Sequence, residues 1–394
     1  MPSPRDFFFG PWRAVGVLGI TQILSWGAIF YPPVMMVPLI AAERGFSFTF
    51  AMGGFSAGLL VAGFVSPTMG SMIDRYGGHR VMPFGSLAGA VGLAGLVYAS
   101  HPLAYLATWM LLGAAMAGSL YDPAFATLGR IFGAGARQPI TVLTLAGGFA
   151  STVSWPATYV LLRWLDWKGT YLVYAALLAF VAAPLLAFAL PRGRAQTDTR
   201  PSEVAKPTPA VHAASGTIFA LLLAAFASYA FVPSGLSTHL LAIFQRAGIE
   251  PGTVVMIGAL FGPAQVAARL CEFVFARNVH PLFIARFAVG LLLVSFGLLW
   301  SFGLSTPVAV AFAILFGAAN GLCTIARGAV PLALFGPVGY GRIIGRIAAP
   351  ALIVTSIAPL VVAFVAERAS DGYALGVAAA FAALSFACFM LIRK

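Results

Sequence analysis

Five ionisable residues lie inside long apolar stretches of the chain. They are Asp122, His239, Arg269, Glu272 and Arg327. A charged side chain at the centre of a bilayer costs roughly 3 kcal/mol or more, so such residues usually face a partner or a water-filled cavity. Each of the five is therefore a candidate functional residue. No Ser–His–Asp pattern, nucleotide-binding loop or metal-ligand spacing accompanies them, so we expect no catalytic residues and no metal site.

Arg269 is the strongest candidate for ligand binding. A guanidinium group presents parallel N–H donors that match a carboxylate at two points. Gln265 lies one helical turn before it, and Asn320 is a mid-span amide in a later segment. We expect these three side chains to contact a small anion. The alternative is that Arg269 forms a structural ion pair with Glu272, one turn away.

Further lining residues are expected among polar and aromatic side chains. Gln22 is a mid-span amide, which usually faces protein or water and not lipid. Tyr31, Trp155 and Tyr229 are the aromatic candidates for the substrate site. Aromatic residues are also common at packing contacts and membrane interfaces, which is the alternative for each of them.

Asp122 and Arg327 occupy similar depths in two apolar segments, the fourth and the tenth. One hypothesis is that they form a bridge that closes an inner gate. The alternative is that Asp122 joins the charged loop at 70–80 while Arg327 extends to the interface. His239 is either a structural group or a proton carrier, since histidine titrates near neutral pH.

The composition requires lipid around most of the surface. Of 394 residues, 60% are hydrophobic and 9% are charged, whereas soluble domains carry about 25% charged residues. The formal net charge of +12 does not indicate nucleic-acid binding, because the basic residues lie between apolar segments and do not line one face. We predict an all-α membrane protein.

The apolar segments predict twelve transmembrane helices in two pseudo-symmetric six-helix bundles. A spanning helix needs about 20 apolar residues. The bundles are expected at residues 1–190 and 216–394, joined by a Pro- and Thr-rich linker at 191–215. The predicted spans are 14–40, 50–73, 81–99, 103–129, 139–162, 170–190, 216–244, 253–275, 281–302, 307–332, 343–366 and 373–391.

Most Lys and Arg residues fall in the termini, the linker and every second loop. Because cytoplasmic loops are enriched in these residues, we expect both termini in the cytoplasm and a location in the cell inner (plasma) membrane. Two six-helix halves related by an axis along the membrane normal are typical of a large class of secondary transporters.

The loop at 70–80 reads GSMIDRYGGHR. It resembles the G-x-x-x-D-R-x-G-x-x-R loop of the major facilitator superfamily. This resemblance implies the major facilitator fold and a gating role for Asp74, Arg75 and Arg80. Physically, Gly70 allows close helix approach, and Asp74 suits the positive N-terminus of a neighbouring helix.

A narrower resemblance concerns the eighth and fourth spans. The eighth is similar to that of the monocarboxylate porters, which carry an arginine that binds the substrate carboxylate. Oxalate–formate exchangers also have an arginine there. The fourth, with Tyr121-Asp122-Pro123-Ala124, is similar to an Asn-Pro segment of the porters. Gln265 stands where the porters have a proton-coupling acid, so proton coupling stays open.

These features predict a secondary active transporter that moves a small organic solute, a carboxylate anion, by alternating access. Glu272 and His239 join the gating or coupling candidates. One alternative is a proton-coupled exporter of drugs, metalloids or other toxic compounds; another is a transporter-like sensor. We expect no enzymatic activity and no cofactor. The expected partners are the substrate, the lipid bilayer and, if coupling occurs, protons, with the chain acting as a monomer.

Overall fold

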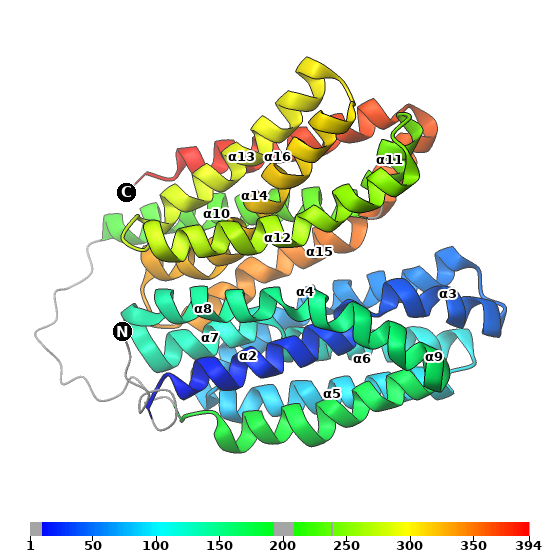
Figure 1. Ribbon diagram of the computed structural model, residues 1–394. Helices are drawn as coiled ribbons and strands as arrows, with labels where there is room; N and C mark the ends of the chain where they lie inside the picture. Colours follow the sequence, from blue (N-terminus) through cyan, green and yellow to red (C-terminus); the bar gives the residue numbers. More distant parts are fainter. Residues whose placement is uncertain (1–9, 193–208, 238, 394) are drawn as a thin grey trace, which may run out of the picture. The chain divides into compact units, whose positions relative to one another are not determined.

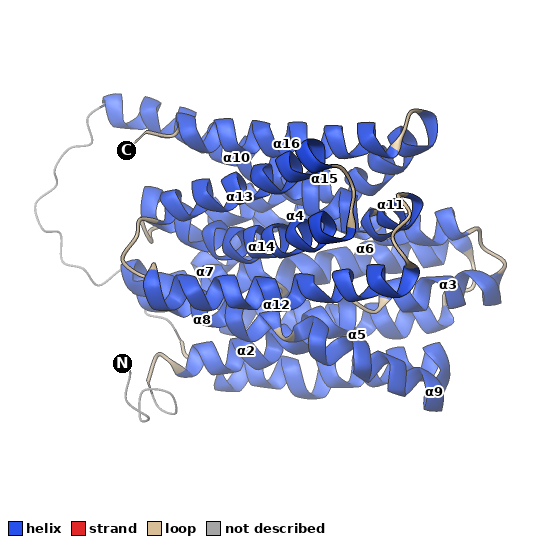
Figure 2. Cartoon of the chain, turned by 45° about the horizontal axis from the view of Figure 1, so that its top comes forward, coloured by secondary structure: helices blue, strands red, loops and turns tan. Residues whose placement is uncertain are grey.

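The computed structural model describes residues 10–192, 209–237 and 239–393. Within these ranges all regular elements are helical and none is a strand (Figure 1, Figure 2). The prediction of an all-α protein is confirmed for this part of the chain. Ten helical runs within it are long and apolar enough to cross a bilayer.

The chain packs as two compact units. The first comprises Met1–Ala195 and Leu334–Ala349, and the second comprises Gln196–Ala333 and Pro350–Lys394. The start of one late helix thus belongs to the first unit while its remainder belongs to the second. The expected boundary at the linker, 191–215, largely lies outside the described residues and stays a prediction.

The first unit begins with a helix that changes its winding. Helix α2 (Arg13–Ser25) continues into the π-helix η1 (Trp26–Phe30), in which the N–H of Tyr31 donates to the carbonyl of Trp26. Helix α3 (Pro33–Arg44) follows, with proline in its first turn, where no N–H is needed. The span expected at 14–40 therefore consists of three segments. π-bulges of this kind often occur at functional sites.

The rest of the first unit contains long helices and one extended helical run. The helices are α4 (Phe48–Tyr76), α5 (Gly78–Tyr98), α6 (Pro102–Ser119), α7 (Tyr121–Phe132), η2 (Gly133–Ala136), α8 (Arg137–Gly148), α9 (Ala150–Leu177), η3 (Leu178–Ala182) and η4 (Leu185–Ala189).

The run from Pro102 to Ala189 is 88 residues long. A straight helix of this length would measure about 130 Å, several times the roughly 30 Å hydrocarbon core. Leu120 is extended, Gly133 has φ +57°, and Asp166 has φ +56° inside α9. These departures from helical geometry divide the run into shorter pieces.

After residue 208, the described part of the chain forms six long helices and one short one. They are α10 (Pro209–Ser237), α11 (Leu240–Arg246), α12 (Pro251–Phe275), α13 (Pro281–Phe302), α14 (Thr306–Phe335), α15 (Tyr340–Arg368) and α16 (Asp371–Leu391). Helix α10 starts seven residues before the expected 216, in an Ala-containing stretch that favours helix. The span expected at 216–244 ends as the separate helix α11.

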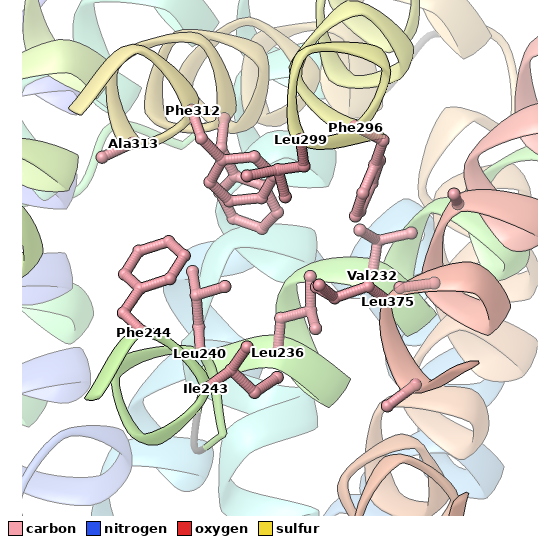
Figure 3. Close-up of a cluster of buried hydrophobic side chains, with 14 of the residues drawn as sticks. Val232, Leu236, Leu240, Ile243, Phe244, Phe296, Leu299, Phe312, Ala313 and Leu375 are labelled. Carbon is pink, nitrogen blue, oxygen red and sulfur yellow. The ribbon is translucent and has the colours of Figure 1, made fainter. Parts of the chain in front are cut away.

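An apolar core holds the second unit together. Phe244 of α11 packs edge-on against Phe312 of α14, which in turn contacts Phe296 of α13. Val232 and Leu375 lie in the same cluster (Figure 3). Because lipid is as apolar as these side chains, close van der Waals packing provides most of the cohesion.

Candidate functional site

A polar cluster lies inside the second unit, on three helices. We call it the Arg269 cluster; it comprises Tyr229 of α10, Gln265 and Arg269 of α12, and Asn320 and Thr324 of α14. It brings together four residues that the sequence singled out as substrate-binding candidates. All four lie within the second unit.

Arg269 is 4% exposed although it lies in a spanning helix. Its Nε donates to the carbonyl of Gly321 at 3.3 Å, and its Nη2 lies 3.3 Å from the side-chain oxygen of Gln265 and 3.4 Å from the hydroxyl of Thr324. These acceptors are all neutral. They hold the guanidinium group in place, and a guanidinium presents parallel N–H donors that suit an anion.

Close contact between α12 and α14 makes this geometry possible. A Cβ on Gly321 would lie 2.5 Å from the carbonyl oxygen of Gln265 and 3.0 Å from its Cα. Any larger residue would push the helices apart and withdraw the Gly321 carbonyl from Arg269. The four-residue spacing of Gly317 and Gly321 is the small-residue pattern of tightly packed membrane helices, and it is the sequence signal for this contact.

Tyr229 and Asn320 complete one side of the cluster. The Tyr229 hydroxyl donates to Oδ1 of Asn320, and the Thr324 hydroxyl donates to the Asn320 carbonyl at 2.9 Å. Cys323, in the same helix as Asn320, is buried. The amide, phenol and hydroxyl groups are neutral hydrogen-bonding groups of the kind that orient small ligands.

Glu272 lies one turn after Arg269 and is 3% exposed. Burial of an acid and a base on one helix fits either a structural pair or a coupling role, and the Arg269–Glu272 alternative stays a prediction. Among the described residues, no group of three or more His, Cys, Asp or Glu side chains converges as a metal site.

A second candidate region lies in the first unit, around the π-helix η1. The Nε2 of buried Gln22 donates to the carbonyl of Ser119 at 2.8 Å, and the indole N–H of Trp26 donates to Oε1 of Gln22 at 3.1 Å. Trp26 also contacts the rings of Tyr31 and Tyr121. The predicted residues Gln22 and Tyr31 thus lie near each other.

Trp155 lies in α9, is 43% exposed and has no ring contact with another described aromatic residue. A nearby residue, Ser154, is buried and donates from its hydroxyl to the Gly27 carbonyl at 2.8 Å, which ties α9 to the π-helix. The role of Trp155 in substrate binding stays a prediction.

The last turn of α4 contacts the start of α15 within the first unit, and only Gly77 separates α4 from α5, so most of the loop expected at 70–80 is helical. The two carboxylate oxygens of Asp74 accept hydrogen bonds from the N–H groups of Gly341 at 2.8 Å and Arg342 at 2.7 Å. These are N–H groups of the first turn of α15, so the carboxylate lies at the positive end of the helix. Gly70 allows this approach, since a Cβ there would overlap the Gly341 carbonyl group.

Arg130 is a member of this region that the sequence prediction missed. It donates to the Asp74 carbonyl and, at 3.4 Å, to the Ile73 carbonyl, and so caps the end of α4. Arg75 is exposed, with its guanidinium 5.1 Å from the ring centre of Tyr76. Arg80 is likewise exposed in the first turn of α5.

The remaining gating candidates occupy three separate positions. Asp122 lies in the first turn of α7, after the break at Leu120, and Arg327 lies in α14. His239 precedes α11, and its Nε2 lies 3.2 Å from the carbonyl of Pro359 in α15. The proposed Asp122–Arg327 bridge joins different units and stays a prediction.

Comparison with known proteins places this architecture in a family. Residues 18–309 match the model of the Major Facilitator Superfamily. The structure is similar to that of the human organic anion transporter MFSD10 (TETRAN), with a TM-score of 0.73 and 17% identity over 98% of this chain and 100% of the other.

It is also similar to FucP, a Major Facilitator Superfamily transporter crystallised in the outward conformation, with a TM-score of 0.70 and 13% identity over 96% of this chain and 98% of that one. No curated relative matches the chain in sequence. The family match covers well over half of the chain, and the fold agrees with it: the chain belongs to the major facilitator superfamily of membrane transporters.

Proposed function

We propose that this chain is a secondary active transporter for a small organic anion, with Arg269 as the group that binds a carboxylate. The burial of the Arg269 guanidinium inside a polar cluster that joins α12 and α14 is the observation that carries the proposal. Guanidinium is the side-chain group best matched to a carboxylate. The fold it shares with an organic anion transporter is compatible with this substrate class.

The proposed architecture is twelve crossings in two bundles of six, in a plasma (inner) membrane, with both termini in the cytoplasm. The 88-residue run supplies three crossings, because its breaks at Gly133 and Asp166 divide it into pieces of spanning length. The nine other helical runs supply one crossing each. The two bundles then alternate in opening to either side.

The Asp74 contact fits the gating part of this proposal. It joins the last turn of α4 to the start of α15 by two hydrogen bonds to a carboxylate. Hydrogen bonds to charged groups contribute about 1.5–3 kcal/mol each. A contact of this strength stabilises the state in which it forms, and transport requires that it break and re-form.

The substrate class is tested first by ligand-dependent thermal stability. A ligand present at 100 times its Kd stabilises the folded state by about 2.7 kcal/mol. Purified protein is screened against carboxylates, amphiphilic drugs and trivalent metalloids. Stabilisation by a carboxylate supports the proposal, whereas stabilisation by drugs or metalloids alone supports the exporter alternative.

The role of Arg269 is tested with Arg269→Lys in proteoliposomes. Lysine keeps the charge but cannot present the two-point fork, so we expect uptake of the identified anion to fall at least tenfold, with loss of its thermal shift. The matched control is Arg277→Lys, because Arg277 is exposed just beyond the end of α12. Equal uptake by the two variants contradicts the assignment of Arg269.

A further inference from the structure

A pocket lies at one end of the second unit, between the start of α13 and the chain that follows α16. Its volume is about 390 Å³, and it is lined by His280, Leu282, Phe283, Arg286 and Arg393. None of these residues belongs to the Arg269 cluster or to the segment at 70–80. We call it the α13–α16 pocket.

Arg286 places a positively charged guanidinium group on one side of this pocket, and two hydrogen bonds hold it there. Its Nε donates to the Phe389 carbonyl at 3.0 Å, and its Nη2 donates to the Ile392 carbonyl at 2.6 Å. The guanidinium thereby caps the last turn of α16, where carbonyls otherwise lack partners. The same bonds hold the chain after α16 beside α13, which brings exposed Arg393 to the pocket.

The positive charge of the pocket has no counter-ion in the described part of the chain. The hydrogen bonds of Arg286 are to carbonyl oxygens, and neither Arg286 nor Arg393 forms an ion pair with a described residue. The sequence contains no Asp or Glu between Glu272 and Glu367, and none after Asp371. The described lining of the pocket contains no acidic side chain, so an anion from outside the chain can bind there.

The backbone N–H groups at the start of α13 are already bonded, so side chains supply the donors that an anion would meet. The Nδ1 of His280 accepts from the N–H of Leu282 at 3.2 Å, and the His280 carbonyl accepts from the N–H of Phe283 at 2.9 Å. An incoming anion thus meets guanidinium N–H groups. These groups match the oxygens of a phosphate at two points.

An apolar strip adjoins the cationic pocket. Phe283 is 59% exposed and Phe287, one turn further along α13, is 51% exposed. A ligand that fills both features carries a negative head and a hydrocarbon chain. Under the orientation proposed above, the pocket faces the cytoplasmic leaflet, whose anionic lipids are attracted to basic groups between transmembrane helices.

We propose that the α13–α16 pocket binds the phosphate group of an anionic phospholipid, with Arg286 and Arg393 as the ligating side chains and Phe283 and Phe287 against an acyl chain. The assignment of this site to the cytoplasmic leaflet rests on the orientation proposed above. The lipid binding itself does not depend on the proposed transport function. Lipid bound there holds the end of α16 against α13.

The test measures lipid binding directly, by native mass spectrometry of the detergent-purified full chain titrated with phosphatidylglycerol or phosphatidylcholine. We expect phosphatidylglycerol adducts to bind about tenfold more weakly to Arg393→Gln, because one charged hydrogen bond is lost. Arg277→Gln is the matched control, an exposed arginine in the loop before α13 that does not line the pocket. We expect its adducts to stay within about twofold of the wild type.

If Arg393→Gln and Arg277→Gln weaken phosphatidylglycerol binding equally, the lipid is attracted to the basic surface in general and the proposal is overturned. The proposal is also overturned if phosphatidylcholine binds the wild type as tightly as phosphatidylglycerol. Inorganic phosphate at low millimolar concentration is the second probe. If it displaces no lipid, the lipid assignment stands; if it displaces the lipid fully, the pocket binds a soluble phosphate and the assignment fails. Arg393→Lys keeps the charge but not the two-point geometry, so we expect its binding to lie between that of the wild type and that of Arg393→Gln.

Discussion

Replacing Gly70 by alanine is expected to loosen the contact between α4 and the start of α15. A Cβ at this position would overlap the Gly341 carbonyl group and lie 2.7 Å from its carbon atom. The obstacle is backbone and not a flexible side-chain end, so a helix has to move. Overpacking of this kind costs about 1–3 kcal/mol.

Alanine also favours helix over glycine by about 1 kcal/mol, which partly offsets this cost in overall stability. Global melting is therefore a poor measure of the effect. The local measure is hydrogen exchange at Gly341 and Arg342, whose N–H groups bond to the Asp74 carboxylate. A loss of 1–3 kcal/mol in this contact speeds their exchange by about 5- to 150-fold.

Gly53→Ala is the matched control for this measurement. Gly53 lies in the same helix and is exposed, and a Cβ there would meet nothing within 4 Å. We expect it to leave exchange at the start of α15 unchanged. If Gly70→Ala also leaves that exchange unchanged in reconstituted protein, the contact does not control the start of α15 and the reasoning fails.

Two further predictions concern stability. The first N–H groups of α12 hold the pKa of the Glu250 carboxyl below its ordinary value, so its stabilisation is present above the unfolded pKa of about 4.3 and is lost as pH falls through the folded one. Glu250→Gln should therefore lower Tm by more at pH 7 than at pH 3; an equal loss at both would show that the charge is irrelevant. Gln22→Leu should destabilise the first unit by about 1–3 kcal/mol, because the Ser119 carbonyl and the Trp26 indole lose their partner; chemical denaturation measures this, and Ile20→Ala, at an exposed site two residues away, is the control.

Part of the fold was predictable because it depends on composition and local pattern. A chain with 9% charged residues and long apolar segments has to form helices in lipid, since only helices and closed barrels satisfy the backbone there. The loop at 70–80 was sufficient to suggest the superfamily, which the family model confirms. The breaks within spans were not predicted, because a π-helix at Trp26–Phe30 leaves hydrophobicity unchanged.

The candidate site was predictable only in outline. Arg269, Gln265, Asn320 and Tyr229 stood out as polar groups in apolar segments, and the structure brings them together. Thr324 was missed, since a threonine in a membrane helix usually bonds to its own backbone. Arg130 was missed because its acceptors, the carbonyls at the end of α4, carry no sequence signal.

The sequence by itself determined that this chain lies in a membrane and which family it resembles, because both follow from residue types and short-range spacing. Tertiary structure decided which groups meet. Asp74 bonds to amides 267 and 268 positions away, and Arg269 reaches a carbonyl 52 positions away. Such pairings depend on the rotation and depth of each packed helix, which small residues such as Gly70 and Gly321 permit but do not specify alone.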